Sequence, residues 1–159
     1  MKGYLHARDV QFRELARERI VIGDLFTYAV AVVPIKTQKQ YYGSISRAVA
    51  AKNIPFPELA LGCAEYVEVS PGSGFIFVAL WNDNNLYSPS HVYNCTRACL
   101  KQASRRSLAQ VAFPLLGGNE RHKFIGAMEQ AVDDAMDETD DRDEPMPEVV
   151  FVTDDELLL

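Results

Sequence analysis

The sequence has few of the residues that build disulfide frameworks or metal centres. It contains three cysteines, Cys63, Cys95 and Cys99, and this odd number does not fit a set of paired disulfides. Cys95 and Cys99 stand one helical turn apart on a face shared with Val92 and Ala103, so both are expected to be small core residues. No histidine is found at ligand spacing to the cysteines and no base beside one, which disfavours a zinc site and a nucleophilic cysteine. We expect no metal and no other cofactor.

Long apolar segments are also missing. No segment approaches the roughly 18 apolar residues that a membrane-spanning helix needs. The first residues, 1–9, contain no extended apolar core of the kind that secretory leaders have. We therefore expect a cytoplasmic protein without a membrane partner.

Positive charge is scarce as well. Lys and Arg number 16 against 22 Asp and Glu, which gives a net charge of −6. This balance argues against a broad nucleic-acid-binding surface. One basic cluster remains, formed by Arg97, Lys101, Arg105 and Arg106, but its spacing follows one helix face, and a solvated face is the simpler interpretation. The composition leaves open whether the protein binds a protein partner.

The composition does support one sizeable core. Hydrophobic residues make up 48% of the 159 residues, which suits one domain better than two. We expect this domain to span residues 1–153, with an acidic, proline-containing linker at 138–147 before the last strand. Residues 154–159 would form a C-terminal tail.

Strand and helix patterns alternate along the chain. Apolar, β-branched runs predict strands at 19–26, 28–35, 64–70, 74–81, 111–116 and 148–153. Helical spacing predicts helices at 43–50, 89–104 and 120–137. Pro71 and Gly72 between two of the strands indicate a hairpin, so the sheet mixes antiparallel and parallel pairs. The order predicts an α/β protein, a three-layer α/β/α sandwich with a mixed central sheet.

Residues 110–119 are the first candidate for a ligand-binding region. A buried strand there runs directly into Gly117 and Gly118, and a helix follows. Its apolar face holds Phe124, Ile125, Met128, Val132, Ala135 and Met136. Backbone N–H groups at the start of such a helix can bind an anion. The glycine pair alone is more simply explained by a tight strand-to-helix turn.

Asp24 is the second candidate. It follows the run Ile20 to Gly23, at the carboxyl end of a predicted strand, where ligands bind in open α/β sheets. An aspartate after a glycine is just as often a turn former or a helix N-cap.

Several segments, in order, resemble the macro domain, the fold that binds ADP-ribose. Ile22-Gly23-Asp24-Leu25 is similar to that family's Gly-Asp-Ile/Leu, and Gly43-Ser44-Ile45-Ser46-Arg47-Ala48-Val49 is similar to its Gly-Ala-Ile-His-Arg-Ala-Ala helix start. Val111-Ala112-Phe113-Pro114-Leu115-Leu116-Gly117-Gly118 resembles its Ala-Phe-Pro strand and second phosphate loop. The resemblance covers roughly residues 20–153 and rests on order and spacing.

The resemblance implies a site for ADP-ribose or a related nucleotide diphosphate. The adenine contact falls on Asp24, with Leu25 adjoining it, and a residue packing on the base falls on Thr153 or Asp154. The diphosphate loops fall on Tyr42, Gly43, Ser44 and Ile45 and on Gly117, Gly118 and Asn119.

Two departures bear on catalysis. Residues 34–37 stand where the family usually has Asn-Ala-Ala-Asn, and residues 38–42 replace its glycine triplet and following aspartate. The distal-ribose asparagine and the hydrolase aspartate are therefore missing, and we assign no catalytic residue.

Three hypotheses follow from these observations. The first is a binding module for ADP-ribose or a similar nucleotide. The second is a degenerate macro-like module for protein interaction, favoured by side chains at 38–42 that would crowd a phosphate. The third is an ADP-ribosyl hydrolase or ADP-ribose phosphatase, for which Asn119, His122 and the asparagines of residues 82–85 are the available polar groups.

Overall fold

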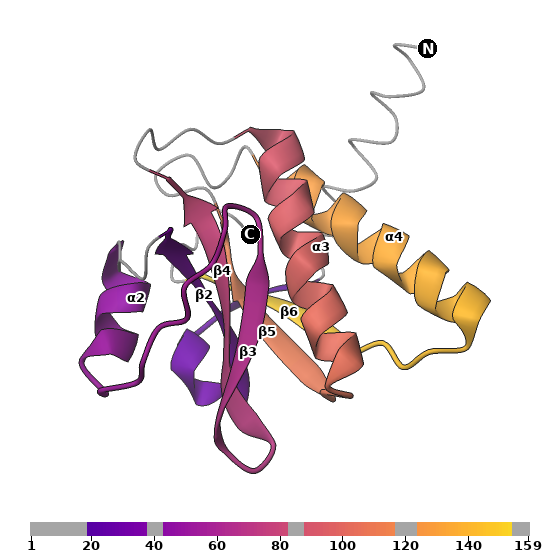
Figure 1. Ribbon diagram of the computed structural model, residues 1–159. Helices are drawn as coiled ribbons and strands as arrows, with labels where there is room; N and C mark the ends of the chain where they lie inside the picture. Colours follow the sequence, from indigo (N-terminus) through magenta and orange to yellow (C-terminus); the bar gives the residue numbers. More distant parts are fainter. Residues whose placement is uncertain (1–18, 38–42, 83–87, 117–123, 154–159) are drawn as a thin grey trace.

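The computed structural model describes residues 19–37, 43–82, 88–116 and 124–153. Six strands form one sheet in the order β1-β6-β5-β2-β4-β3 (Figure 1). The strands are β1 (Ile20–Ile22), β2 (Val30–Lys36), β3 (Ala64–Ser70), β4 (Ser73–Trp81), β5 (Gln110–Pro114) and β6 (Glu148–Thr153). The helices are the 3₁₀ turn η1 (Leu25–Thr27), α2 (Gly43–Ala50), α3 (Pro89–Arg105) and α4 (Ile125–Arg142).

The sheet is mixed, as the sequence predicts. β3 and β4 form the expected antiparallel hairpin, and every other neighbouring pair is parallel. β2 and β5 lie inside the sheet and pair with each other at Ala31 and Ala112. Their residues from Val30 to Ile35 and from Val111 to Pro114 are buried, because strands covered on both faces carry continuous apolar runs. The prediction that both are central strands is confirmed, although β2 begins after Tyr28.

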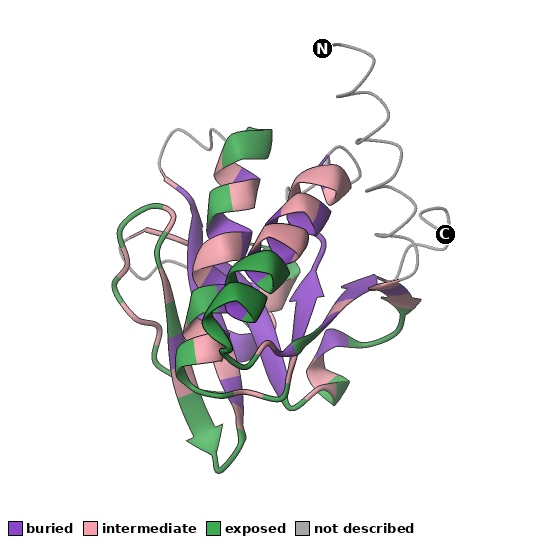
Figure 2. Cartoon of the chain, turned by 90° about the vertical axis from the view of Figure 1, so that its right-hand side faces the viewer, coloured by how far each residue is buried: buried purple, intermediate pink, exposed green. Residues whose placement is uncertain are grey.

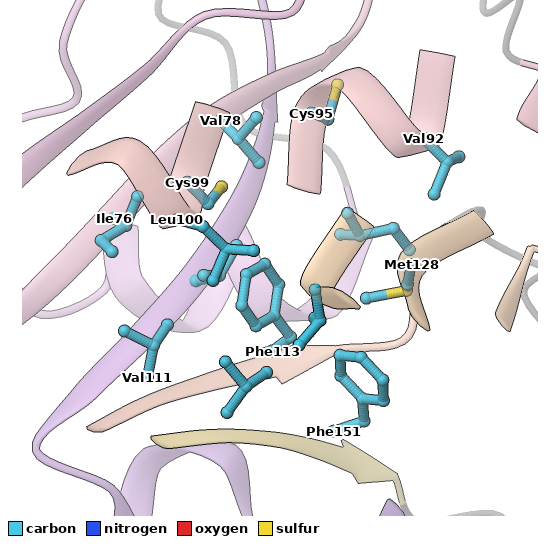
Figure 3. Close-up of a cluster of buried hydrophobic side chains, with 14 of the residues drawn as sticks. Ile76, Val78, Val92, Cys95, Cys99, Leu100, Val111, Phe113, Met128 and Phe151 are labelled. Carbon is cyan, nitrogen blue, oxygen red and sulfur yellow. The ribbon is translucent and has the colours of Figure 1, made fainter. Parts of the chain in front are cut away.

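Helices cover both faces of the sheet. In Figure 1, α3 and α4 lie side by side on one face and α2 on the other. Between the sheet and the α3–α4 pair, Phe113 and Phe151 meet edge to face with ring centroids 6.0 Å apart, beside Leu100 of α3 and Met128 of α4 (Figure 3). Figure 2 shows buried residues concentrated in the sheet and on the helix sides that face it. The three-layer α/β/α architecture is confirmed.

The core of the opposite face is smaller. Val33 and Ile35 of β2 and Phe77 of β4 pack with Val49 of α2, and all four side chains are fully buried. Successive side chains of β2 point to opposite faces of the sheet. Val33 and Ile35 therefore point to the same face and pack against α2, which holds this helix on the middle of the sheet.

The apolar face of α4 is narrower than the sequence predicts. Met128, Val132 and Ala135 are buried as expected, but Met136 is 40% exposed. Met136 is eight positions after Met128, and at 3.6 residues per turn this places it well to one side of the stripe. The prediction for Met136 was wrong.

The predicted linker at 138–147 was also partly wrong, because α4 continues through Arg142. In its last turns, Thr139 is buried and donates its hydroxyl to the carbonyl of Ala135 in the same helix, and Arg97 of the neighbouring α3 pairs with Glu138. The helix ends at Asp143, which adopts the left-handed conformation. Only 143–147 connects α4 to β6.

No helix in the described part of the chain combines the length and the apolar composition that a membrane span requires.

Candidate ligand site

The parallel strands bring several predicted site residues to one edge of the sheet. β1, β6, β5 and β2 are neighbours that run in the same direction, so their carboxyl ends lie together. Asp24 follows β1, Thr153 ends β6, and Leu116 follows β5 on the way to residues 117–119. This is the edge at which open α/β sheets bind ligands.

Asp24 and Thr153 come from adjacent strand ends. Ile22 is in register with Thr153, and the N–H of Gly23 donates to the Thr153 carbonyl at 3.1 Å. The buried Thr153 is thus the last residue of β6 and lies directly beside the loop that carries Asp24. Asp24 is therefore a neighbour of Thr153, which is one of the two residues to which the resemblance assigns packing on the base.

The Asp24 carboxylate caps η1. Its Oδ1 accepts a hydrogen bond from the backbone N–H of Phe26 at 2.9 Å, and the Thr27 hydroxyl donates to the Asp24 carbonyl at 2.7 Å. Of the possibilities left open by the sequence, the N-cap role is confirmed. Asp24 remains exposed, and a carboxylate has about four acceptor positions, so capping is compatible with a ligand contact.

Leu25 and Ile45 lie beneath the site. Leu25 is buried against Ala31, Ala112 and Val152, and Ile45 of α2 packs on the same cluster. The side chain of Leu25 therefore belongs to the core that supports the loop. The shared cluster attaches η1 and α2 to the same face of the sheet.

The start of α2 offers backbone donors. Gly43 has a φ of +87°, a conformation that L side chains rarely adopt, and both Gly43 and Ser44 are exposed. Ser46 is buried and its hydroxyl donates to the Gly43 carbonyl at 3.4 Å. N–H groups in the first helical turn have no partner within the helix, which makes this end suitable for an anion.

Four predicted ligand residues, Tyr42, Gly117, Gly118 and Asn119, lie outside the described residues, as do Asp154 and His122. The elements that flank residues 117–123 are those the sequence predicts, since β5 precedes them and α4 begins at Ile125.

Lys36 ends β2 and lies within residues 34–37, where the resembling family usually has Asn-Ala-Ala-Asn. The pairing of β2 with β4 is irregular between Ile35 and Lys36, so that Lys36 stands opposite Trp81. The next residue, Thr37, donates its backbone N–H to the Trp81 carbonyl at 3.0 Å. The half-buried residue Lys36 thus ends its strand at the carboxyl edge of the sheet.

A histidine that the sequence analysis did not single out, His91, lies beside Cys95. His91 Nε2 lies 2.8 Å from the Leu80 carbonyl oxygen and 3.5 Å from Cys95 Sγ. The spacing in the sequence could have predicted this contact, because residues four positions apart on a helix are neighbours on its surface, as His91 and Cys95 are. The prediction that no histidine has ligand spacing to the cysteines was wrong. Even so, nowhere in the described ranges do three His, Cys, Asp or Glu side chains gather in a way that could hold a metal.

Burial makes the helix cysteines unreactive. It raises the pKa of the Cys95 thiol to about 12, with a smaller contribution from Cys63, and it also raises the pKa of Cys99. The thiolate is the reactive form of cysteine, so neither of these side chains suits nucleophilic catalysis.

The basic cluster on α3 is partly engaged within the fold. Arg97 pairs with Glu138 of α4, and this hydrogen bond lowers the pKa of the Glu138 carboxyl. Lys101, Arg105 and Arg106 are exposed. The solvated-face interpretation therefore holds for these three residues.

Comparison with solved structures identifies the architecture. The chain is similar to a mutant macrodomain of Oceanobacillus iheyensis with ADPR, with a TM-score of 0.67 and 17% identity over 87% of this chain and 86% of that one. The chain has the macrodomain fold. It is also similar to the Oceanobacillus iheyensis macrodomain with ADP, at a TM-score of 0.64 and 18% identity over 87% of this chain and 84% of that one.

A third similar structure is the Trypanosoma brucei macrodomain in complex with ADP-ribose, with a TM-score of 0.65 and 14% identity over 88% of this chain and 66% of that one. No family model and no curated protein matches the sequence. The macrodomain likeness is thus a likeness of three-dimensional structure, and the expectation drawn from order and spacing is confirmed at the level of the fold.

Proposed function

We propose that this macrodomain-fold protein is a binding module for ADP-ribose or a related nucleotide diphosphate and that it does not catalyse a reaction on it. The observation that carries the proposal is the hydrogen bond from Gly23 to Thr153, which sets Asp24 beside Thr153 at the carboxyl edge of the sheet. Solved macrodomains that are similar in fold hold ADPR, ADP-ribose or ADP.

The chemistry of the edge suits such a ligand. The exposed carboxylate of Asp24 can accept a hydrogen bond from the amino group of a purine. At the start of α2, the backbone N–H groups after Gly43 can donate to phosphate oxygens, and the helix dipole favours the negative charge. The half-buried Lys36 adds a positive charge at the same edge.

Titration calorimetry with ADP-ribose tests the proposal, with ADP and NAD as comparison ligands. Ser44→Asp places a negative charge at the second residue of α2, so it should abolish binding by repelling the diphosphate. Ser90→Asp is the matched control, because Ser90 is the second residue of α3 and is also exposed. Both substitutions should leave the melting temperature unchanged or slightly raised.

Two results would contradict the proposal. Equal affinity in the Ser44 and Ser90 variants would move the ligand away from α2. No heat of binding from the parent protein with any of the three nucleotides would favour the alternative, a macrodomain-fold module for protein interaction. In the second loop, we also expect Gly117→Val to abolish binding with little change in melting temperature, since a side chain there would crowd the phosphate.

The absence of catalysis rests on the residue types in the first loop. Tyr42 stands where hydrolases of the family have aspartate, and a phenol with an unperturbed pKa near 10 is seldom a base at pH 7. A time course of de-ADP-ribosylation should show no appreciable turnover. Turnover that is lost on Asn119→Ala or His122→Ala would establish the protein as an enzyme instead.

A further inference from the structure

A lysine beyond the end of α2 lies over two aromatic rings. The Nζ atom of Lys52 is 4.8 Å from the ring centroid of Phe26 and 5.9 Å from that of Phe75. Both distances are within the range at which an ammonium group is attracted by the negative face of a ring. Lys52 itself is held close to α2, because its backbone N–H donates to the Val49 carbonyl at 3.0 Å.

The Phe26 ring is held from a second side by the sheet. Phe26 and Phe75 of β4 meet edge to face, with centroids 6.3 Å apart and an interplanar angle of 71°. Phe26 is half-buried and packs against the cluster of Val33, Ile35, Val49 and Phe77, so Lys52 and Phe75 add two directed ring contacts to this packing. The ring thereby links α2, η1 and β4.

The restraint on Phe26 reaches Asp24 through one hydrogen bond. The backbone N–H of Phe26 donates to Oδ1 of Asp24 at 2.9 Å, and the Thr27 N–H donates to the Asp24 carbonyl at 3.1 Å. The orientation of the carboxylate therefore depends on where the Phe26 backbone lies. A displacement of the Phe26 residue as a whole would move the donor that orients Oδ1.

We propose that Lys52 is a positioning residue for nucleobase selection: by holding the Phe26 ring it fixes the Asp24 carboxylate that meets the base. This inference rests on the proposed function. A fixed carboxylate accepts a hydrogen bond from an exocyclic amino group and repels an oxo group at the same place, so it selects amino-bearing purines. Lys52 acts from the far end of α2 and does not touch the ligand.

The test compares ADP with inosine diphosphate, which carries an oxo group in place of the adenine amino group. Titration calorimetry is run on the parent, Lys52→Met, Lys52→Arg and Phe26→Leu, with Lys101→Met as the control for loss of an exposed lysine. In Lys52→Met we expect the preference for ADP to fall about two- to fivefold, in line with an exposed cation–π contact. Lys52→Arg should keep the preference because guanidinium also binds ring faces.

A double substitution tests whether Lys52 acts on the base preference through the Phe26 ring. If Lys52 acts through the Phe26 ring, Lys52→Met should change nothing further in a Phe26→Leu background. Hydrogen exchange of the Phe26 amide, measured without ligand, should be faster in Lys52→Met than in Lys101→Met. This second measurement does not depend on nucleotide binding.

The outcomes separate the two proposals. A parent that binds ADP, with an unchanged ADP preference or unchanged Phe26 exchange in Lys52→Met, overturns the role of Lys52 alone. A parent that binds none of ADP-ribose, ADP, NAD and inosine diphosphate overturns the proposed function and, with it, base selection by Asp24. A fall in the ADP preference that Lys52→Arg restores supports both.

Discussion

The guanidinium of Arg19 forms an ion pair with the carboxylate of Glu129, whose side chain is completely buried. A second nitrogen of Arg19 lies 3.7 Å from an oxygen of Asp133 and 3.6 Å from the sulfur of Met136. These contacts join the residue that precedes the edge strand β1 to the middle of α4. They explain how a charged side chain can occupy a helix face that packs on the core.

Removing Arg19 should therefore destabilise the protein strongly. Arg19→Met leaves Glu129 buried without its main cation, and we expect the free energy of unfolding to fall by about 3–5 kcal/mol. The double substitution Arg19→Met with Glu129→Met removes both charges and should recover most of this loss. Urea unfolding at pH 7 measures both. A single variant as stable as the parent would show that water reaches Glu129 freely.

Gly74 has no room for a side chain. A Cβ atom there would lie 2.2 Å from the Val67 carbonyl oxygen and 2.9 Å from the Glu68 Cα, and neither backbone atom can rotate away. Gly74→Ala should lower the free energy of unfolding by about 1–3 kcal/mol. Gly126→Ala is the control: it lies within α4 with nothing within 4 Å of the new Cβ, and it should gain about 0.5–1 kcal/mol. Equal stabilities in chemical denaturation would contradict the close approach of β3 and β4.

The two α4 methionines should respond differently to truncation. Met128 is fully buried between α4 and the sheet, so Met128→Ala should cost about 2–5 kcal/mol. Met136→Ala removes the same atoms from a side chain that is 40% exposed and should cost much less. Thermal and urea unfolding of the pair check this. A loss below about 0.5 kcal/mol for Met128→Ala would mean that this face is solvated.

Alkylation should distinguish the three cysteines. Cys63 is exposed, whereas Cys95 and Cys99 are buried, and burial raises the pKa of both. With iodoacetamide at pH 8, intact mass spectrometry should find one label on the folded chain and three in denaturant, because only an accessible thiolate reacts. Cys63→Ser should take no label while folded. Rapid labelling of Cys95 would show that α3 opens from the sheet.

Much of the fold follows from local patterns. The buried runs of β2 and β5 and the proline–glycine hairpin between β3 and β4 could be predicted because strand periodicity and turn chemistry depend on neighbouring residues. The same is true of the apolar face of α3, where Val92, Cys95 and Cys99 are all buried. The position of Asp24 at a strand end is a local property too.

The end of α4 could not be predicted in this way. Acidic residues are unfavourable at the carboxyl end of a helix, so composition indicated a linker from residue 138. The helix persists because Arg97 on α3 neutralises Glu138 and because Thr139 is buried against the fold. The pair of Arg97 and Glu138 joins residues that are 41 positions apart in the sequence.

The sequence by itself determined the order of the strands and helices and the burial of the central strands β2 and β5. Only the tertiary structure decided the strand order that sets Asp24 beside Thr153, the burial of Glu129 with Arg19, and the placement of Lys52 over Phe26. The physical reason is that the hydrophobic periodicity that predicts strands and helices depends only on residues close together in the chain. Pairing between strands, charges and rings depends on packing that brings distant residues together.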